Sequence, residues 1–178
     1  MMMTTTTLPA IRRLGALDES HVRGLAQVLC DCVAGGASVS FMQPLSLERA
    51  EGFWRDVAAG VARGERALLV AEDAGGAIVG TVQLVFAQPE NQPHRADIAK
   101  MLVHRRARRL GVGAAVLEAA ERAAAKAGKT LLVLDTASAD AERLYERRGW
   151  QRVGTIPDFA LWPDGKLCDT VVYYKRLH

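Results

Sequence analysis

The sequence contains no long apolar run, although hydrophobic residues make up 49% of its 178 residues. A helix that crosses a bilayer needs about 20 consecutive, mostly apolar residues, and no segment approaches that length. The first residues, Met1 to Pro9, also lack the basic start and the apolar centre of a secretory signal peptide. We therefore expect a cytoplasmic protein that has no membrane partner.

Cysteine is scarce, and its spacing fits neither a disulfide framework nor a metal site. The chain has three cysteines, Cys30, Cys32 and Cys168, and this odd number suits reduced thiols in a cytosol. A zinc knuckle requires two residues between its paired cysteines and a matching second pair. Cys30 and Cys32 are separated by a single residue and have no such second pair. We expect the cysteines to serve in packing, and we expect no bound metal.

The net charge is also small, at +3. A charge of this size does not by itself indicate a nucleic-acid partner or a membrane surface. Positive charge is concentrated at Arg105, Arg106, Arg108 and Arg109. A nucleic-acid surface typically has a second basic face or aromatic residues interleaved with the basic ones. Neither feature accompanies this cluster. We interpret the cluster as a site for a small anion and expect no nucleic-acid partner; nucleic acid is the alternative interpretation.

The basic cluster lies between a predicted strand and a predicted helix. Residues 97–103 are apolar enough for a buried strand, and the alanine-rich segment 114–127 has helical spacing. Between them the chain reads Arg108-Arg-Leu-Gly-Val-Gly113. The free N–H groups and the dipole of a helix N-terminus attract anions, and glycine lacks the Cβ that would hold a phosphate away from the backbone. The junction therefore predicts a diphosphate site.

Two common phosphate-binding motifs do not fit this loop. A P-loop ends in Lys followed by Ser or Thr, whereas Ala114 and Ala115 follow Gly113 here. A dinucleotide fingerprint has a third glycine and lies near the start of a βαβ unit, whereas this loop lies past the middle of the chain.

The pattern Arg-x-x-Gly-x-Gly after a strand that ends at Val103 resembles the signature of the GCN5-related N-acetyltransferase (GNAT) superfamily. A second segment, Ala141-Glu-Arg-Leu-Tyr-Glu-Arg-Arg-Gly-Trp150, is similar to the next motif of that superfamily, in which Leu-Tyr precedes a Gly-aromatic step. Shorter segments resemble the tabtoxin-resistance acetyltransferases, namely Gly35 to Met42, His94 to Asp97, Leu134 to Thr136 and Pro163 to Gly165.

The resemblance implies an α/β (α+β) fold, with a mixed, twisted sheet of about six to seven strands, splayed in the middle, and about four flanking helices. We predict a flexible tail over residues 1–10 and a single domain over residues 11–178, because no linker or repeat interrupts the chain. Strands are predicted over 11–17, 66–72, 77–88, 95–104, 131–135, 150–156 and 171–175, and helices over 18–33, 46–63, 114–127 and 139–148.

The same resemblance implies acetyl transfer from acetyl-coenzyme A, used as a co-substrate, to a primary amine. It implies that the exposed backbone of the strand before the loop pairs with the pantetheine arm and that the loop binds the diphosphate. The corresponding cofactor-binding residues are Met101, Leu102, Val103, Arg108, Arg109, Leu110, Gly111, Val112, Gly113 and Ala114. Ser138 stands where many relatives carry an Asn that contacts the cofactor.

Acetyl transfer to an amine requires a base for the ammonium and an acid for the departing thiolate. Asp97 is our candidate base, because partial burial in an apolar strand raises a carboxyl pKa; the alternative is an ion pair with Arg95 or Lys100. Tyr145 is our candidate acid, a role that the matching Tyr often has in the superfamily; the alternative is packing on the cofactor helix. Asp135 could bind a cationic acceptor or join the proton relay, or it could belong to a helix N-cap.

The acceptor pocket is expected at two irregular, apolar stretches that flank the site in this fold. They contain Phe41, Met42, Phe159 and Trp162, and apolar walls of this kind are typical of ligand pockets; the alternative is that they cover the core edge. We expect a small-molecule amine as substrate and a homodimer. The resemblance to the tabtoxin-resistance acetyltransferases implies that the amine is an amino-acid-like toxin and that the protein has a role in toxin resistance. The alternatives are acetylation of a protein lysine or N-terminus, and a non-catalytic coenzyme A sensor.

Overall fold

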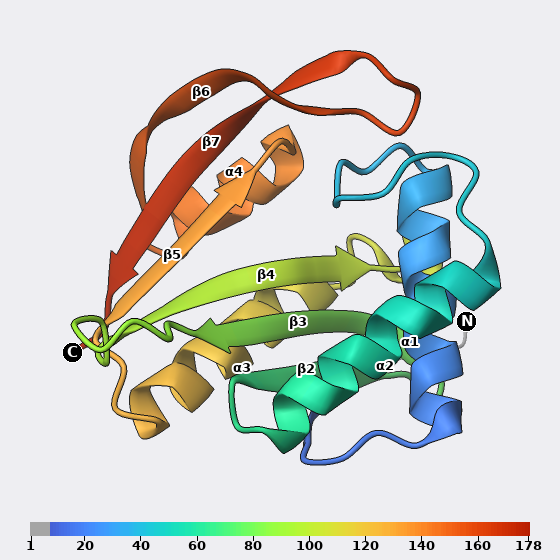
Figure 1. Ribbon diagram of the computed structural model, residues 1–178, viewed down its shortest axis with the longest axis horizontal. Helices are drawn as coiled ribbons and strands as arrows, with labels where there is room; N and C mark the ends of the chain where they lie inside the picture. The colour runs from blue at the N-terminus through green and yellow to red at the C-terminus, as the bar shows by residue number, and fades with distance from the viewer. Residues whose placement is uncertain (1–7) are drawn as a thin grey trace, which may run out of the picture.

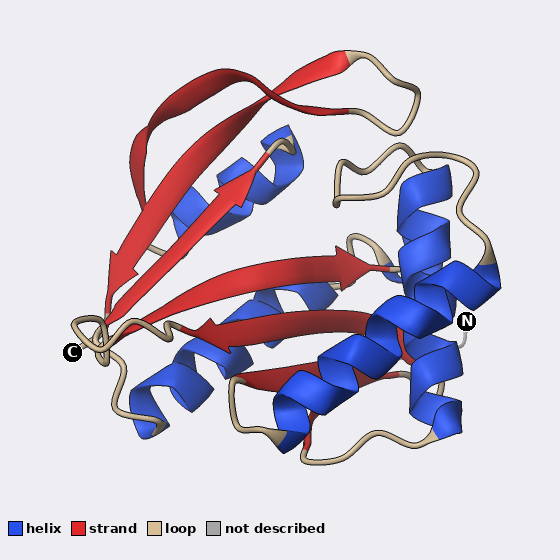
Figure 2. Ribbon diagram, in the orientation of Figure 1, coloured by secondary structure: helices blue, strands red, loops and turns tan. Residues whose placement is uncertain are grey.

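The computed structural model describes residues 8–178, which form one mixed sheet with helices on both faces (Figures 1 and 2). Most of the predicted tail, residues 1–7, lies outside the described residues, and Ala10 already belongs to the first strand. The strands are β1 Ala10–Leu14, β2 Arg66–Glu72, β3 Ile78–Phe86, β4 Arg95–Val103, β5 Leu131–Thr136, β6 Gln151–Leu161 and β7 Leu167–Arg176. The helices are α1 Glu19–Ala34, α2 Leu47–Ala62, α3 Val112–Lys126 and α4 Ala139–Arg147, with a short 3-10 turn, η1, at Arg105–Ala107.

The sheet divides in its middle, between β4 and β5. The strand order is β1-β2-β3-β4-β5-β7-β6, and only the β4–β5 pair is parallel. This pair is short: Arg95–Asp97 lie beside Leu131–Val133, and beyond them the two strands diverge, which Figure 1 shows as a widening wedge. The predicted fold class, a mixed sheet of about six to seven strands splayed in the middle and flanked by about four helices, is confirmed, because the described residues form seven strands and four α-helices.

Two apolar clusters cover the two faces of the sheet. Helix α3 packs through small residues such as Ala120 and Ala124, which are fully buried and let the helix lie close to β2, β3 and β4. Helices α1 and α2 pack on the opposite face around the buried Trp54. Both helices begin at the predicted caps, because the side chains of Asp18 and Ser46 accept backbone N–H bonds of 2.8 and 3.2 Å. Within residues 8–178 no helix is long and apolar enough to cross a membrane.

The last two strands are longer than the sequence predicts. The patterns indicated strands over 150–156 and 171–175, whereas β6 and β7 span Gln151–Leu161 and Leu167–Arg176. Most of β6 is exposed, its pairing with β7 shifts between Ile156 and Ala160, and it contains Pro157. An exposed edge strand has no apolar alternation to mark its extent, so its second half was missed.

Gly80 of β3 lies where the sheet meets the start of α3, and no side chain fits there. A Cβ atom at Gly80 would lie 2.8 Å from Cγ1 of Val112, the first residue of α3. We expect Gly80→Ala to lower the free energy of unfolding by about 1–3 kcal/mol, as overpacking does, and to weaken coenzyme A binding by moving the helix N-terminus. Urea denaturation and calorimetry measure the two effects.

Two variants control for this prediction. Gly52→Ala in α2 meets no atom within 4 Å and should stabilise the protein slightly, because alanine favours a helix. Adding Val112→Ala to Gly80→Ala should restore much of the lost cofactor affinity. If Gly80→Ala binds coenzyme A as the wild type does, the contact with Val112 does not position α3.

Candidate active site

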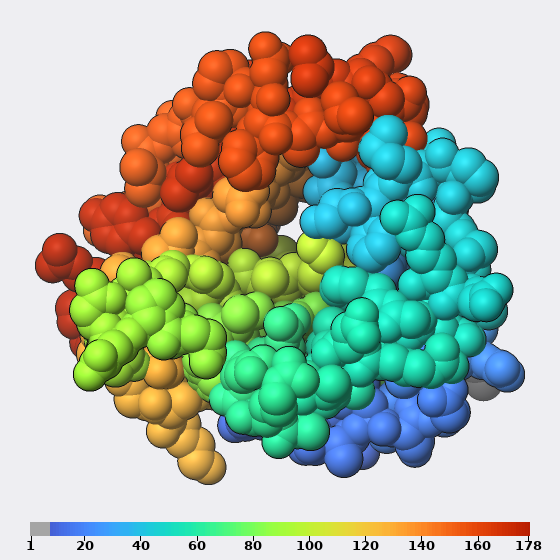
Figure 3. Space-filling model, viewed as in Figure 1, coloured from blue at the N-terminus to red at the C-terminus, as the bar shows by residue number. Residues whose placement is uncertain are grey.

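A cavity of about 1130 Å³ lies where β4 and β5 diverge. Figure 3 shows it as a hollow between the cyan segment after α1 and the orange and red β6–β7 hairpin. Its walls come from five parts of the chain, which are residues 35–42, β4, the start of α3, the β5–α4 junction and the hairpin. Every site residue predicted from the sequence lines this cavity except Asp97 and Leu110.

The loop before α3 presents unused backbone donors to the cavity. Among residues 8–178, no hydrogen-bond partner is found for the N–H groups of residues 109–114. Gly111, the N-cap residue, has a φ of 79°, and Arg109 has a φ of 61°. At Gly113 a Cβ would lie 3.4 Å from Leu144 of α4, so a larger side chain would press against that helix. Free amides at the positive end of a helix dipole suit a diphosphate.

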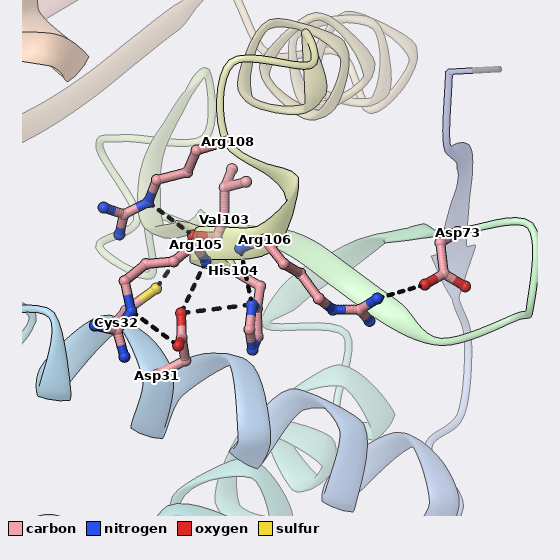
Figure 4. Close-up of polar contacts among 8 residues, drawn as sticks. All are labelled: Asp31, Cys32, Asp73, Val103, His104, Arg105, Arg106 and Arg108. Carbon is pink, nitrogen blue, oxygen red and sulfur yellow. Dashed lines mark hydrogen bonds and ion pairs between the residues drawn. The ribbon is translucent and has the colours of Figure 1, made fainter. Parts of the chain in front are cut away.

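Two arginines of the basic cluster form ion pairs within the fold, and the other two line the cavity. Arg105 bonds to Asp31 of α1 at 3.0 Å, and Arg106 bonds to Asp73 of the β2–β3 turn at 2.9 Å (Figure 4). Arg108 instead donates from Nε to the carbonyl oxygen of Val103 at 3.3 Å, and it lines the cavity together with Arg109. The predicted anion site is therefore narrower than the cluster, because Arg105 and Arg106 tie η1 to its neighbours.

We expect Gly111→Ala to weaken coenzyme A binding roughly tenfold to a hundredfold, because a change in the left-handed backbone moves amides worth about 1.5–3 kcal/mol each to a charged ligand. Calorimetry measures the affinity. Gly128→Ala is a matched control, because Gly128 has a φ of 77° and lies beyond the far end of α3, outside the cavity lining. Both variants should lose similar stability; equal coenzyme A affinity in the two would contradict the amide cradle.

The edge of β4 that faces β5 is open beyond Asp97, because pairing with β5 stops there. Met101 and Leu102 line the cavity along this edge. Val103 also lines it, but its carbonyl oxygen already accepts bonds from Arg108 Nε and from Cys32 Sγ, the latter at 3.5 Å. The extended pantetheine arm can pair with such an edge as a peptide adds to a sheet. The carbonyl of Val103 has a different role, because it accepts from Arg108 and orients that side chain.

Tyr145 is buried in the cavity wall, with its ring against Trp150 and Tyr173 at centroid distances of 5.7 and 5.9 Å. Its hydroxyl lies 3.9 Å from the sulfur of Met101 on β4. Burial, with a smaller contribution from the charge of Asp135, raises the pKa of the Tyr145 phenol well above its ordinary value. The phenol therefore keeps its proton at neutral pH, as a proton donor must.

The two candidate carboxylates occupy different positions. Asp97 forms an ion pair with Arg95 at 2.5 Å, is 43% exposed, and does not line the cavity. Burial raises the pKa of Asp97; Arg95 opposes this shift and Asp135 adds to it. Asp135 lines the cavity, and its Oδ2 accepts a 2.7 Å bond from the Thr170 hydroxyl.

The charge of Asp135 acts on three groups of β4 and α4. It adds to the raised pKa of Asp97 and of Tyr145, and it opposes the lowering of the Lys100 pKa by burial. Ser138, next along the same junction, is the N-cap of α4 and accepts the N–H of Ala141 at 3.3 Å. The hydroxyl hydrogen of Ser138 remains available to a ligand in the cavity.

The two stretches that carry the predicted pocket residues, the segment after α1 and the end of β6 with the turn that follows it, are hydrogen-bonded to each other. Ser38 donates to the carbonyl of Leu161 at 3.1 Å, and the N–H of Gln43 donates to the carbonyl of Pro163 at 3.1 Å. The four predicted pocket residues all line the cavity beside these contacts, namely Phe41, Met42, Phe159 and Trp162. The stretches therefore close one side of the cavity.

Lys100 and Ser40 also line the cavity, and neither was predicted to take part in binding. Lys100 belongs to a bulge, because Lys100 and Met101 oppose the single residue Val82 of β3. Its Nζ donates to the Ser40 hydroxyl at 2.9 Å. A lysine inside an apolar strand could have indicated a binding residue, but Lys100 was considered only as an ion-pair partner for Asp97.

Residues 36–150 match the model of the acetyltransferase (GNAT) family. The chain belongs to this family. It is an acetyl-coenzyme A dependent acetyltransferase, and the free amides before α3 fit the diphosphate of that co-substrate. Within residues 8–178 no group of three or more His, Cys, Asp or Glu side chains is arranged to hold a metal ion.

Solved structures share the fold of this acetyltransferase over nearly its whole length. A proposed acetyltransferase from Acinetobacter baylyi ADP1 is 17% identical, with a TM-score of 0.81 over 99% of this chain and 95% of that one. The ribosomal-protein-alanine N-acetyltransferase of Brucella melitensis is 21% identical, with a TM-score of 0.78 over 94% and 99%. A phosphinothricin acetyltransferase of Sinorhizobium meliloti, in complex with acetyl-coenzyme A, is 17% identical, with a TM-score of 0.78 over 95% and 88%.

Proposed function

We propose that the enzyme acetylates the primary amine of a small, amino-acid-like molecule, as a toxin-resistance acetyltransferase of the tabtoxin type. The observation that carries this proposal is the contact across the acceptor side of the cavity, where residues 38–43 and the β6–β7 hairpin are hydrogen-bonded to each other. Aromatic walls joined across one side of a cavity suit a small ligand, whereas a protein segment needs a long open groove.

The proposed reaction is direct transfer. Asp135 takes a proton from the ammonium group, with Asp97 acting through a water, and the free amine then attacks the thioester carbonyl. A bond forms between nitrogen and the carbonyl carbon, and the bond between that carbon and sulfur breaks. Tyr145 gives its proton to the departing thiolate, and the second proton, which leaves the nitrogen as the amide forms, restores the phenol of Tyr145. Direct transfer uses no covalent carrier, and Cys32 is poorly suited to be one, because burial raises the pKa of its thiol whereas a covalent carrier needs a lowered one.

The alternative acceptor is a protein lysine or N-terminus. One structural neighbour is named as a ribosomal-protein-alanine N-acetyltransferase and another as a phosphinothricin acetyltransferase, so the shared fold alone does not favour either class. A coenzyme A sensor without catalysis is a third reading, and the positions of Tyr145 and Asp135 in the cavity wall argue against it.

A thiol-release assay with acetyl-coenzyme A and a panel of acceptors tests the proposal. The panel contains free amino acids, polyamines and peptides with a free N-terminus or an internal lysine. We expect turnover with free amino acids and none with the peptides. Faster turnover with peptides would identify the enzyme as a protein acetyltransferase, and binding of coenzyme A without turnover on any amine would identify a sensor.

A further inference from the structure

Two residues with strained backbones meet at one hydrogen bond inside the cavity. Ser40 and Lys100 have φ angles of 77° and 48°, in the left-handed region that residues other than glycine rarely adopt. They are 60 positions apart, and the bond from Lys100 Nζ to Ser40 Oγ joins them. Strained positions of this kind collect at functional sites, where the surrounding structure holds them in place.

The ammonium group of Lys100 has no counter-ion within the described part of the chain. None of the ion pairs among residues 8–178 includes Lys100, whereas the similarly buried Lys175 pairs with Glu121 at 2.9 Å. Instead, Lys100 Nζ lies 5.9 Å from the centroid of the Phe53 ring. A partly buried cation without an anion is unfavourable, and burial accordingly lowers the pKa of Lys100, which Asp135 partly opposes.

The cavity therefore presents opposite charges from the two diverging strands. Lys100 lines it from β4 and Asp135 lines it from β5, and the two groups sense each other electrostatically although they form no ion pair. A ligand that carries both an ammonium group and an anion would complement this pair. The Ser40 hydroxyl, which accepts from Lys100, has a proton that it can donate to the same anion.

We propose that Lys100 and Ser40 bind a carboxylate of the acceptor, so that the substrate is a small amine that also carries a carboxylate. The proposal rests on the proposed function and identifies the residues that recognise the acid group of its substrate. The ammonium group of the acceptor faces Asp135, its carboxylate accepts hydrogen bonds from Lys100 Nζ and Ser40 Oγ, and the aromatic walls contact the rest. Lys100 is then a specificity-determining residue that takes no part in the proton transfers.

The test compares matched acceptors with and without this charge. Amino acids are offered with acetyl-coenzyme A as free acids and as carboxamides, and thiol release gives kcat and KM. We expect the wild type to prefer free acids by roughly tenfold or more in kcat/KM, because a site built to bind a charged group rejects the analogue that lacks it. In Lys100→Met the preference disappears through a higher KM for the acids, while turnover of the carboxamides stays within about threefold.

Two further variants separate recognition from packing. Lys100→Arg keeps the charge and should keep part of the preference for acids. Lys129→Met is a matched control, because Lys129 also donates to an oxygen, that of Pro93 at 2.6 Å, and lies 5.1 Å from a ring centroid, that of Phe86, but does not line the cavity. Lys129→Met should keep the preference in full.

Equal use of acids and carboxamides by the wild type overturns the proposal, and so does an equal loss of both activities in Lys100→Met. Calorimetry of the same ligands with the coenzyme A complex extends the test to acceptors that turn over slowly, and the lack of a Lys100-dependent preference for acids there also overturns it. Turnover of amines without that preference leaves the proposed function standing. Lys100-dependent binding of acids without any acetylation would retain the carboxylate site and reject the proposed function.

Discussion

We expect Tyr145→Phe to lower kcat by about 10²–10⁴-fold, the usual range for loss of a general acid, with little change in coenzyme A affinity. The phenol is buried in the cavity wall and lies against Met101 on the open edge of β4, where the thioester arm is expected to lie. Phenylalanine keeps the contacts of the ring with Trp150 and Tyr173 and removes only the proton that the thiolate needs. Steady-state thiol release and calorimetry measure the two quantities.

The raised pKa of Tyr145 adds a pH dependence to this prediction. Because burial favours the neutral phenol, the proton donor persists above the ordinary tyrosine pKa of about 10. Activity should therefore show no decline from tyrosine ionisation up to that pH. Tyr174→Phe is the control, since Tyr174 bonds to Gln151 at 2.6 Å and does not line the cavity. Full turnover by Tyr145→Phe would exclude the acid role.

We expect Asp135→Asn to lower kcat/KM by about 10²–10⁴-fold, and Asp97→Asn to lower it by roughly tenfold. Asp135 lines the cavity and can accept the amine proton directly, whereas Asp97 is paired with Arg95 outside the lining. Asparagine at position 135 can still accept the Thr170 hydroxyl bond, so its structural role is largely kept. Thiol release over a range of pH compares the variants, with coenzyme A affinity as the check on folding.

The pH profile identifies which carboxylate is the base. A base acts only when ionised, so activity is lost as the pH falls through its pKa. Burial raises the pKa of Asp97, so an Asp97 base would lose activity at a pH above the ordinary range for aspartate. If Asp97→Asn abolishes that acidic decline and is the more damaging substitution, Asp97 is the direct base and Asp135 is a positioning residue.

Local sequence determined those features of the enzyme that depend on neighbours along the chain. Helix α3 begins at Val112, two residues before the predicted start, with Gly111 as its N-cap and Gly113 in its first turn. Its free amides could be predicted because only a short loop and the first helical turn are needed to expose them. The helices begin at Asp18 and Ser46 because a cap acts within about three residues. The apolar runs of β2 and β3 were visible because these strands are buried, and the exposed second half of β6 was missed for the opposite reason.

Tertiary structure alone decided which charged groups face the cavity. Arg105 and Arg106 are bound by Asp31 and Asp73, which lie 74 and 33 positions away in the chain, and no local pattern distinguishes them from Arg108 and Arg109. The bulge in β4 reverses the alternation of the strand, so Lys100 reaches Ser40 and lines the cavity while Asp97 stays with Arg95. The role of a carboxylate or an amine depends on which groups and which cavity surround it. Here the cavity forms because strands β4 and β5 diverge after three residue pairs, and residues far apart in the sequence determine what faces it.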